Sequence, residues 1–535
     1  MGRIRLSVGL VCLALATSVA RAAPPPKASP PPDDVATLAA RIDRLIETGY
    51  VENSVEPAPL ADDAEFIRRV YLDLAGHIPR VSEVHKFLDD KATNKRLALV
   101  EELLKGPHYV NHFTNVWRAL LLPQNNNQQV QFLAGQIEGW VRPRLRDNKP
   151  YDQMVRELLT APVVFNRGGM PQRNGTDFGA IAFYQANESK PENVAAATSR
   201  LFLGIKLECA QCHNHPFARW SRKQFWEYAA FFSGIRPQQA QAGVFSQVLD
   251  DPTKREIKIP NSDKTVTAHF LDGKEPKWKD GASTRATLAE WMTAGDNPFF
   301  AKAIANRLWG HFFGLGIIDP VDDFGEANPP SHPQLLDELG QAMVKHKFDM
   351  RFMIRAITAS RTYQRTSRMT DSSQEDPRLF ARMPLKGLTA EQIFDSLALA
   401  TGYRDPQANS AGGFNRFNGA RAEFLLKFAN NSDKRTEYQT SILQALSLMN
   451  GTFIANATSL DRSETLAGLL DAPFMNNRQR LDALHLAALG RPMHAREADR
   501  LLSYVERGGP SGDKRRALAD VFWTLLNSSE FIFNH

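Results

Sequence analysis

Apolar side chains recur every three to four positions along most of the chain. Between residues 35 and 46 they fall on one face of a helix, and polar side chains occupy the other face. The same spacing continues in six further segments, which are 64–75, 97–104, 113–121, 478–489, 495–505 and 515–526. The pattern therefore predicts a mostly α-helical protein in which most helices bury one face.

Local signals indicate where several helices begin and break. The segments Ser221–Gln224 and Thr389–Gln392 each have the spacing of a capping box, so we expect a helix to begin directly after residue 221 and after residue 389. Another helical stretch, 139–159, contains Pro143 and Pro150. Because proline lacks a backbone N–H, we expect this stretch to break near both residues.

One part of the chain alternates polar and apolar residues instead. Residues 255–259 and 265–270 show this alternation, and turn-forming residues lie between them, which is typical of a β-hairpin. We expect a small β insert here, between two helical domains. The expected bounds of the first helical domain, the β insert with its linker and the second helical domain are 33–236, 237–281 and 282–535.

The N-terminus has the features of a secretory signal peptide. Arg3 and Arg5 precede an apolar run over residues 8–16, and the triplet Ala20-Arg21-Ala22 fits cleavage after Ala22. The run is shorter than the roughly 20 residues that cross a bilayer, so we expect no transmembrane span. A Pro- and Ala-rich tether follows at 23–32. We therefore expect an exported protein, periplasmic or extracellular after cleavage.

Composition and net charge bear on whether the protein binds nucleic acid. The chain of 535 residues is 43% hydrophobic and 23% charged, as is usual for a globular protein. Removal of Arg3, Arg5 and Arg21 with the signal peptide lowers the formal net charge from +6 to +3. Since no basic run is present either, we expect no nucleic-acid partner.

The cysteines carry the most specific chemistry. After cleavage only Cys209 and Cys212 remain, and both lie in the segment Cys209-Ala-Gln-Cys212-His213. This CxxCH pattern is the attachment signature of c-type haem, in which two thiols form thioethers and the adjacent imidazole binds the iron. The sequence thus favours haem c as cofactor and an extracytoplasmic redox or electron-transfer role, with a redox or cell-envelope partner of unknown identity.

A haem at this position requires its sixth ligand from elsewhere in the chain. Candidates are His77, His108, His112 and several methionines, and the sequence does not choose among them.

Other uses of the same residues remain open. The two thiols can form a local disulfide, be plain buried cysteines, or bind zinc or another metal together with His213 or His215. A disulfide or zinc staple would fit a cell-surface structural or interaction protein rather than a redox protein.

A second group of polar residues lies on a long Pro- and Asp-rich loop, 319–333. Asp322, Asp323 and His332 are candidate ligands of a cation or an acid–base pair. Such a site would indicate a metal-dependent enzyme that acts on extracellular polysaccharide. The alternative is a loop held by its own capping carboxylates and prolines. Since the chain lacks the common hydrolase, nucleotide-binding and zinc-protease motifs, its status as an enzyme stays open.

Several of these segments resemble one family. Residues 203–217, around the CxxCH, closely resemble the signature of the planctomycete cytochrome-like secreted proteins, and residues 68–76 fit the front of the same domain. Four later segments resemble parts of the second domain of that family, and these are 297–309, 322–333, 360–364 and 527–531. The resemblance implies export and two domains, the first with a cytochrome-like motif, but no established activity. One departure is Trp117-Arg118-Ala119, where many relatives carry Trp-Leu-Asp.

Overall fold

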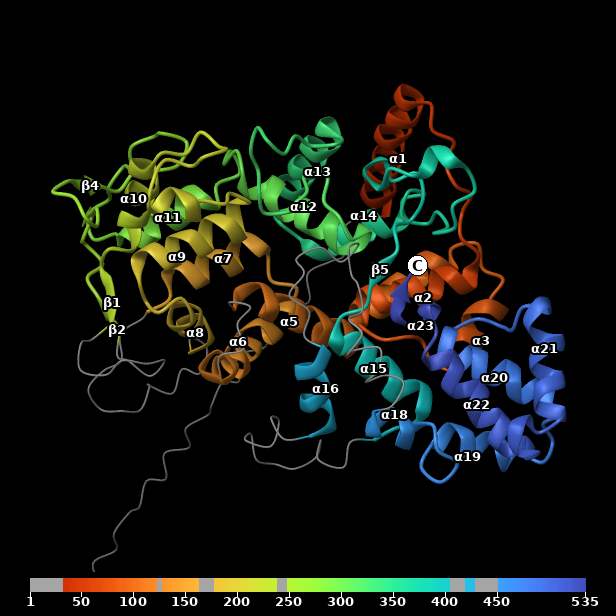
Figure 1. Cartoon of the computed structure of the whole chain (residues 1–535). Helices are drawn as coiled ribbons and strands as arrows, with labels where there is room; N and C mark the ends of the chain where they lie inside the picture. The colour runs from red at the N-terminus through yellow and green to blue at the C-terminus, as the bar shows by residue number, and fades with distance from the viewer. Residues whose placement is uncertain (1–31, 123–127, 163–177, 238–247, 405–418, 429–450) are drawn as a thin grey trace, which may run out of the picture.

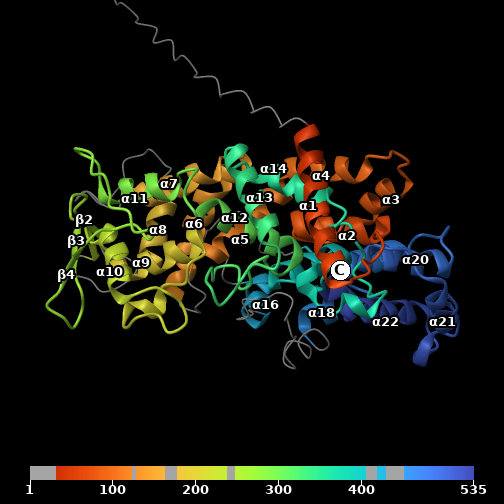
Figure 2. The same ribbon diagram turned by 90° about the horizontal axis from the view of Figure 1, so that it is seen from above.

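The protein is mostly α-helical, as the sequence predicts. The computed structural model describes residues 32–122, 128–162, 178–237, 248–404, 419–428 and 451–535. The expected signal peptide and nearly all of the tether lie outside these residues. The molecule is elongated, with α9–α11 at one end and α20–α22 at the other (Figures 1 and 2).

Nine α-helices precede the CxxCH segment in the described residues. They are α1 (Pro32–Asn53), α2 (Asp63–Leu74), α3 (Val81–Asp89), α4 (Lys95–Lys105), α5 (Pro107–Leu121), α6 (Gln128–Arg146), α7 (Tyr151–Thr160), α8 (Phe178–Ala186) and α9 (Pro191–Thr198). The expected break near Pro150 is confirmed, but the break near Pro143 is wrong, because α6 continues through Pro143. Packing of α6 against α5 and α8 offsets the one missing backbone hydrogen bond.

The β insert is confirmed in its described part. Strands β3 (Glu256–Lys258) and β4 (Thr265–Thr267) form the expected antiparallel hairpin, with Ile257 opposite Val266. A second antiparallel pair, β1 (Ile235–Pro237) with β2 (Val248–Asp250), lies beside it in sequence. The insert follows α10 (Arg222–Ala229), whose capping box at Ser221 is formed as expected.

The remaining helices form the second half of the chain. They are α11 (Thr284–Met292), α12 (Phe300–Phe313), α13 (Pro333–Lys345), α14 (Met350–Ala359), α15 (Ala390–Thr401), α16 (Ala420–Phe428), α18 (Thr452–Ala457), α19 (Glu464–Leu470), α20 (Asn477–Leu489), α21 (Ala495–Glu506), α22 (Lys514–Leu526) and α23 (Ser529–Ile532). The capping box at Thr389 begins α15 as expected. No helix in the described part of the chain is long and apolar enough to span a membrane.

Two hydrophobic clusters organise the packing. The members of the first cluster lie between Val35 and Met383, with the addition of Leu486, so this cluster draws on residues before and after the β insert. The second consists of residues between Leu388 and Phe531 together with Leu72 and Ile78 from the N-terminal part. Helix α2 therefore belongs to both clusters and links them.

A buried polar network secures this link. The Lys386 ammonium donates to the Asp73 carboxylate at 2.6 Å and to the carbonyl oxygen of Phe312 at 2.5 Å, and the Lys386 and Asp73 side chains are both 0% exposed. The Tyr363 hydroxyl and the Asn534 amide also donate to Asp73, at 2.9 and 2.8 Å. Strands β5 (Lys386–Gly387) and β6 (Phe533–Asn534) pair beside this network, so the C-terminus lies next to α2 (Figure 1).

Candidate functional site

The backbone that leads to the CxxCH segment departs from regular helix. Helix α9 passes into a π-helix, Ser199–Leu203, and Gly204 then adopts a left-handed conformation with φ of +68°. A short 3-10 helix, Glu208–Gln211, follows and carries Cys209. π-helical turns occur frequently at functional sites, so the backbone marks this region independently of the cysteines.

Both thiols and His213 are accessible. Cys209 and Cys212 are free and exposed, and they lie within and directly after the 3-10 helix, while Ala210 between them is buried. His213 is also exposed, and its Nδ1 lies 2.7 Å from the carbonyl oxygen of Asn214. Because a carbonyl only accepts, Nδ1 carries the proton and Nε2 keeps its lone pair for a ligand.

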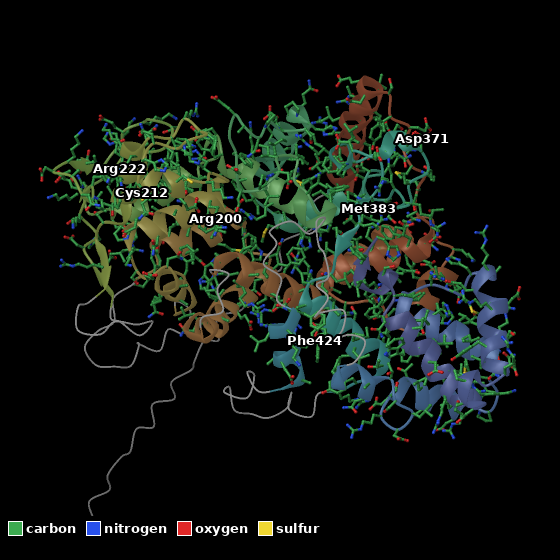
Figure 3. The ribbon with its side chains drawn as sticks, viewed as in Figure 1. Arg200, Cys212, Arg222, Asp371, Met383 and Phe424 are labelled. Atoms are coloured by element: carbon green, nitrogen blue, oxygen red, sulfur yellow. The ribbon has the colours of Figure 1, made fainter. Side chains whose placement is uncertain are left out.

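Contacts with α10 hold the CxxCH turn in place. The indole N–H of Trp226 donates to the carbonyl oxygen of Gln211 at 3.0 Å. The backbone N–H of Arg222 donates to the amide oxygen of Asn214 at 2.9 Å. Cys212, Arg200 and Arg222 lie at the same end of the molecule (Figure 3). The turn is thus fixed at two points while its thiols face solvent.

His215 serves the turn itself. Its Nδ1 accepts from the backbone N–H groups of Phe217 and Ala218, at 3.2 and 3.0 Å. The proton of the neutral ring therefore sits on Nε2, which leaves no lone pair for a metal. This bonding favours a structural role for His215, and its role as a metal ligand stays a prediction.

Aromatic residues around the turn divide into core and surface. Trp220, Phe225 and Trp226 are buried, so they form the platform beneath the turn and are not available to a bound group. Phe217, in contrast, is 81% exposed, and Arg219 lies over the Trp220 ring at 5.4 Å. The exposed apolar surface beside the cysteines is therefore that of Phe217.

The Asp-rich loop packs against the chain that enters the CxxCH turn. The backbone N–H of Phe324 donates to the carbonyl oxygen of Gly204 at 2.7 Å. The Phe324 ring covers Gly204 so closely that a Cβ built there would lie 2.9 Å from it. The Arg200 guanidinium lies 3.4 Å from the Glu208 carboxylate and 3.3 Å from that of Asp322. We call these five residues the clamp.

The clamp brings together the two regions that the sequence singled out separately. Gly204, Glu208 and Phe324 lie in the segments that carry the family resemblance, but nothing in the sequence indicates that the two segments meet, because the contact joins positions more than 100 residues apart. The left-handed glycine is the one local hint, and only the structure shows what covers it.

The other expected ligands of the Asp-rich loop do not converge. The backbone of Asp323 donates to Pro320 and accepts from Asn328, within the loop. His332 is buried, its Nδ1 lies 3.1 Å from the Ser331 hydroxyl, and its ring packs against Phe380. Burial lowers the pKa of His332 to about 4. In the described part of the chain, no three His, Cys, Asp or Glu side chains are grouped to hold a metal ion.

The three histidines that are candidate sixth ligands of a haem make their contacts elsewhere. The rings of His77 and His108 contact each other with centroids 4.6 Å apart, and His112 packs against His311. These histidines belong to α5, to α12 or to the segment just after α2, whereas the cysteines lie beside α10. None of these contacts involves the CxxCH turn.

Comparison with known proteins identifies two regions. Residues 41–237 match the family model PSCyt2, described as a protein of unknown function (DUF1549), and residues 284–423 match PSD1, described as a protein of unknown function (DUF1553). No curated protein and no solved structure matches the chain. The chain thus carries two successive domains of unknown function, and the CxxCH turn lies in the first of them.

Proposed function

We propose that the protein binds one c-type haem through Cys209 and Cys212, with His213 as axial ligand. In this proposal the chain is exported, as its N-terminal signal predicts, and serves redox or electron-transfer chemistry outside the cytoplasm. Haem supplies an iron centre that exchanges one electron, and the protein controls it through ligation and burial.

The observation that carries the proposal is the accessibility of all three attachment groups on one short turn. Cys209 and Cys212 are free thiols at the surface, separated by the buried Ala210. His213 directly follows, and its Nδ1 donates to the carbonyl oxygen of Asn214, so in the neutral ring the lone pair lies on Nε2. Covalent attachment requires reduced, exposed thiols, and the turn offers two of them next to an exposed imidazole.

The residues around the turn have supporting roles. The bonds from Trp226 and Arg222 fix the backbone, so the thiols keep their spacing before attachment. Phe217 provides an exposed apolar surface beside them. The platform of Trp220, Phe225 and Trp226 is already buried beneath the turn. A haem bound here would therefore be more open to solvent than one inside a deep pocket.

The proposal is tested by spectroscopy on protein expressed with a c-type haem maturation system. The pyridine haemochrome of the purified wild type should show covalent haem that resists acid–organic extraction. The Cys209→Ser/Cys212→Ser variant should lose it completely, since no thioether can form. A wild type without covalent haem would refute the proposal.

A matched pair of histidine variants tests whether His213 binds the iron while His215 only holds the turn. His213→Ala should change the visible spectrum by removing the axial imidazole. His215→Gln should keep the wild-type spectrum, because a side-chain amide oxygen can still accept the backbone N–H bonds of the turn. Identical spectra for both variants would exclude His213 as ligand.

A further inference from the structure

A second histidine site lies away from the CxxCH turn. His77 follows Gly76, which ends α2 in a left-handed conformation with φ of +77°. Its Nδ1 lies 2.7 Å from the carbonyl oxygen of Ile78. Since the carbonyl only accepts, Nδ1 holds the proton and Nε2 is left with a lone pair.

Among the residues that the structure describes, that lone pair has no hydrogen-bond partner. The Nε2 atom of His77 is buried, and no hydrogen bond reaches it from the residues that the structure describes. A buried acceptor without a partner costs free energy, so its retention calls for an explanation. The bond from one ring nitrogen to a backbone carbonyl, with the other nitrogen bare, is the arrangement that metal-binding histidines usually have.

A second imidazole lies next to it. His108, in the first turn of α5, places its ring centroid 4.6 Å from that of His77, at an interplanar angle of 82°. His108 is exposed. Two imidazoles that share one metal at about 2.1 Å per bond and at roughly a right angle have ring centres about 4.5 Å apart. The observed centroid distance is of this size, and a turn of the exposed His108 side chain is what would bring both imidazoles to face one ion.

Burial favours the neutral form of the His77 imidazole. Burial lowers the pKa of His77, and the neighbouring His108 lowers it further, while Glu83 and Asp395 act in the opposite direction. Glu83 accepts from the backbone of Arg80, and Asp395 pairs with Arg421. At neutral pH the His77 imidazole is therefore neutral.

We propose that His77 and His108 bind one divalent transition metal ion, with water completing its coordination. Imidazole suits Cu²⁺, Ni²⁺ and Zn²⁺, and Cu²⁺ binds most tightly in this series. The described residues offer no third His, Cys, Asp or Glu, so the site has two protein ligands. Because His108 lies at the surface, its side chain can turn to admit the ion beside His77.

The test uses the full mature chain without haem, in a Cys209→Ser/Cys212→Ser/His213→Ala background that removes the CxxCH ligands. Titration with Cu²⁺ should show one bound ion, with electron paramagnetic resonance couplings from two imidazole nitrogens. His77→Ala and His108→Ala should each weaken binding at least tenfold. His85→Ala, which removes an exposed histidine on α3, should bind like the parent.

The outcomes are distinct from those of the haem experiment. A parent that binds no Cu²⁺, or His108→Ala with unchanged affinity and couplings, would overturn the metal site. His108 is exposed, so its replacement should leave the fold intact, and circular dichroism verifies this. Because the background lacks the CxxCH ligands, the result is independent of whether haem is ever attached.

Discussion

Gly204 is the residue on which the approach to the CxxCH turn depends. Its φ of +68° is available to glycine at little cost, and the Phe324 ring occupies the space that a side chain would need. Gly273 has a similar φ of +82° but nothing within 4 Å of a built Cβ. Substitution of Gly273 therefore reports the cost of backbone strain alone, whereas substitution of Gly204 adds the loss of packing with Phe324.

We predict that Gly204→Ala lowers the free energy of unfolding by more than about 2 kcal/mol, whereas Gly273→Ala lowers it by about 1 kcal/mol. The difference reflects displacement of Phe324 and of the clamp. Urea unfolding of both variants measures it. Equal losses would show that the Phe324 contact adds nothing to the strain at Gly204.

His332 gives the protein a defined response to acid. The ordinary pKa of 6.5 applies to the unfolded chain, and burial lowers the pKa in the folded protein to about 4. Below pH 6.5 the unfolded chain takes up a proton that the folded chain does not. The stabilising contribution of neutral His332 is therefore complete above pH 6.5 and is lost as the pH falls towards 4.

The free energy of unfolding of the wild type should fall between pH 6.5 and pH 4. We predict that this loss is smaller in His332→Gln by roughly 2 to 3 kcal/mol. Urea midpoints measured at intervals across this range, with the slope held common, provide the comparison. Parallel curves for the two proteins would mean that His332 does not take part in the acid response.

Among the secondary-structure elements, those that depend on neighbouring residues could be predicted from the sequence, whereas the pairing of distant segments could not. The capping boxes at Ser221 and Thr389 and the hairpin at residues 256–267 depend on neighbours in sequence, so the sequence alone located them. The pairing of β5 with β6 involves two residues per strand that are nearly 150 positions apart, and no periodicity signals it.

The candidate site shows the same division. The spacing of the two cysteines and His213 marks the turn without any structure. The clamp, by contrast, depends on how α12 and the loop that follows it pack against the π-helix, which no local pattern encodes. Sequence reasoning also grouped His332 with the Asp322 carboxylate, although its ring lies against Phe380 instead.

The Asp73–Lys386 pair links α2 to β5 through two fully buried charges. Loss of one partner leaves a buried charge without its counterpart. We predict that Lys386→Met lowers the free energy of unfolding by about 3 to 5 kcal/mol, and that adding Asp73→Asn restores part of this loss. Urea unfolding of both single variants and the double variant gives the coupling, and strictly additive losses would contradict it.

At the scale of the whole molecule, the two clusters and the candidate site are arranged along one long axis. The CxxCH turn lies beside α10 at one end, and α20–α22 of the second cluster lie at the other (Figures 1 and 2). The clamp ties the turn to a loop of the second domain of unknown function. Both domains thus contribute to holding a turn whose reactive groups all belong to the first.

The most direct test of the haem proposal is the intact mass of the mature protein after expression with the c-type maturation system. We expect the mass of the polypeptide from Ala23 onward plus one haem, retained under denaturing conditions. We also expect the bare polypeptide mass for Cys209→Ser/Cys212→Ser. A wild type with the bare polypeptide mass, and with Cys209 and Cys212 free or joined to each other, would contradict the account.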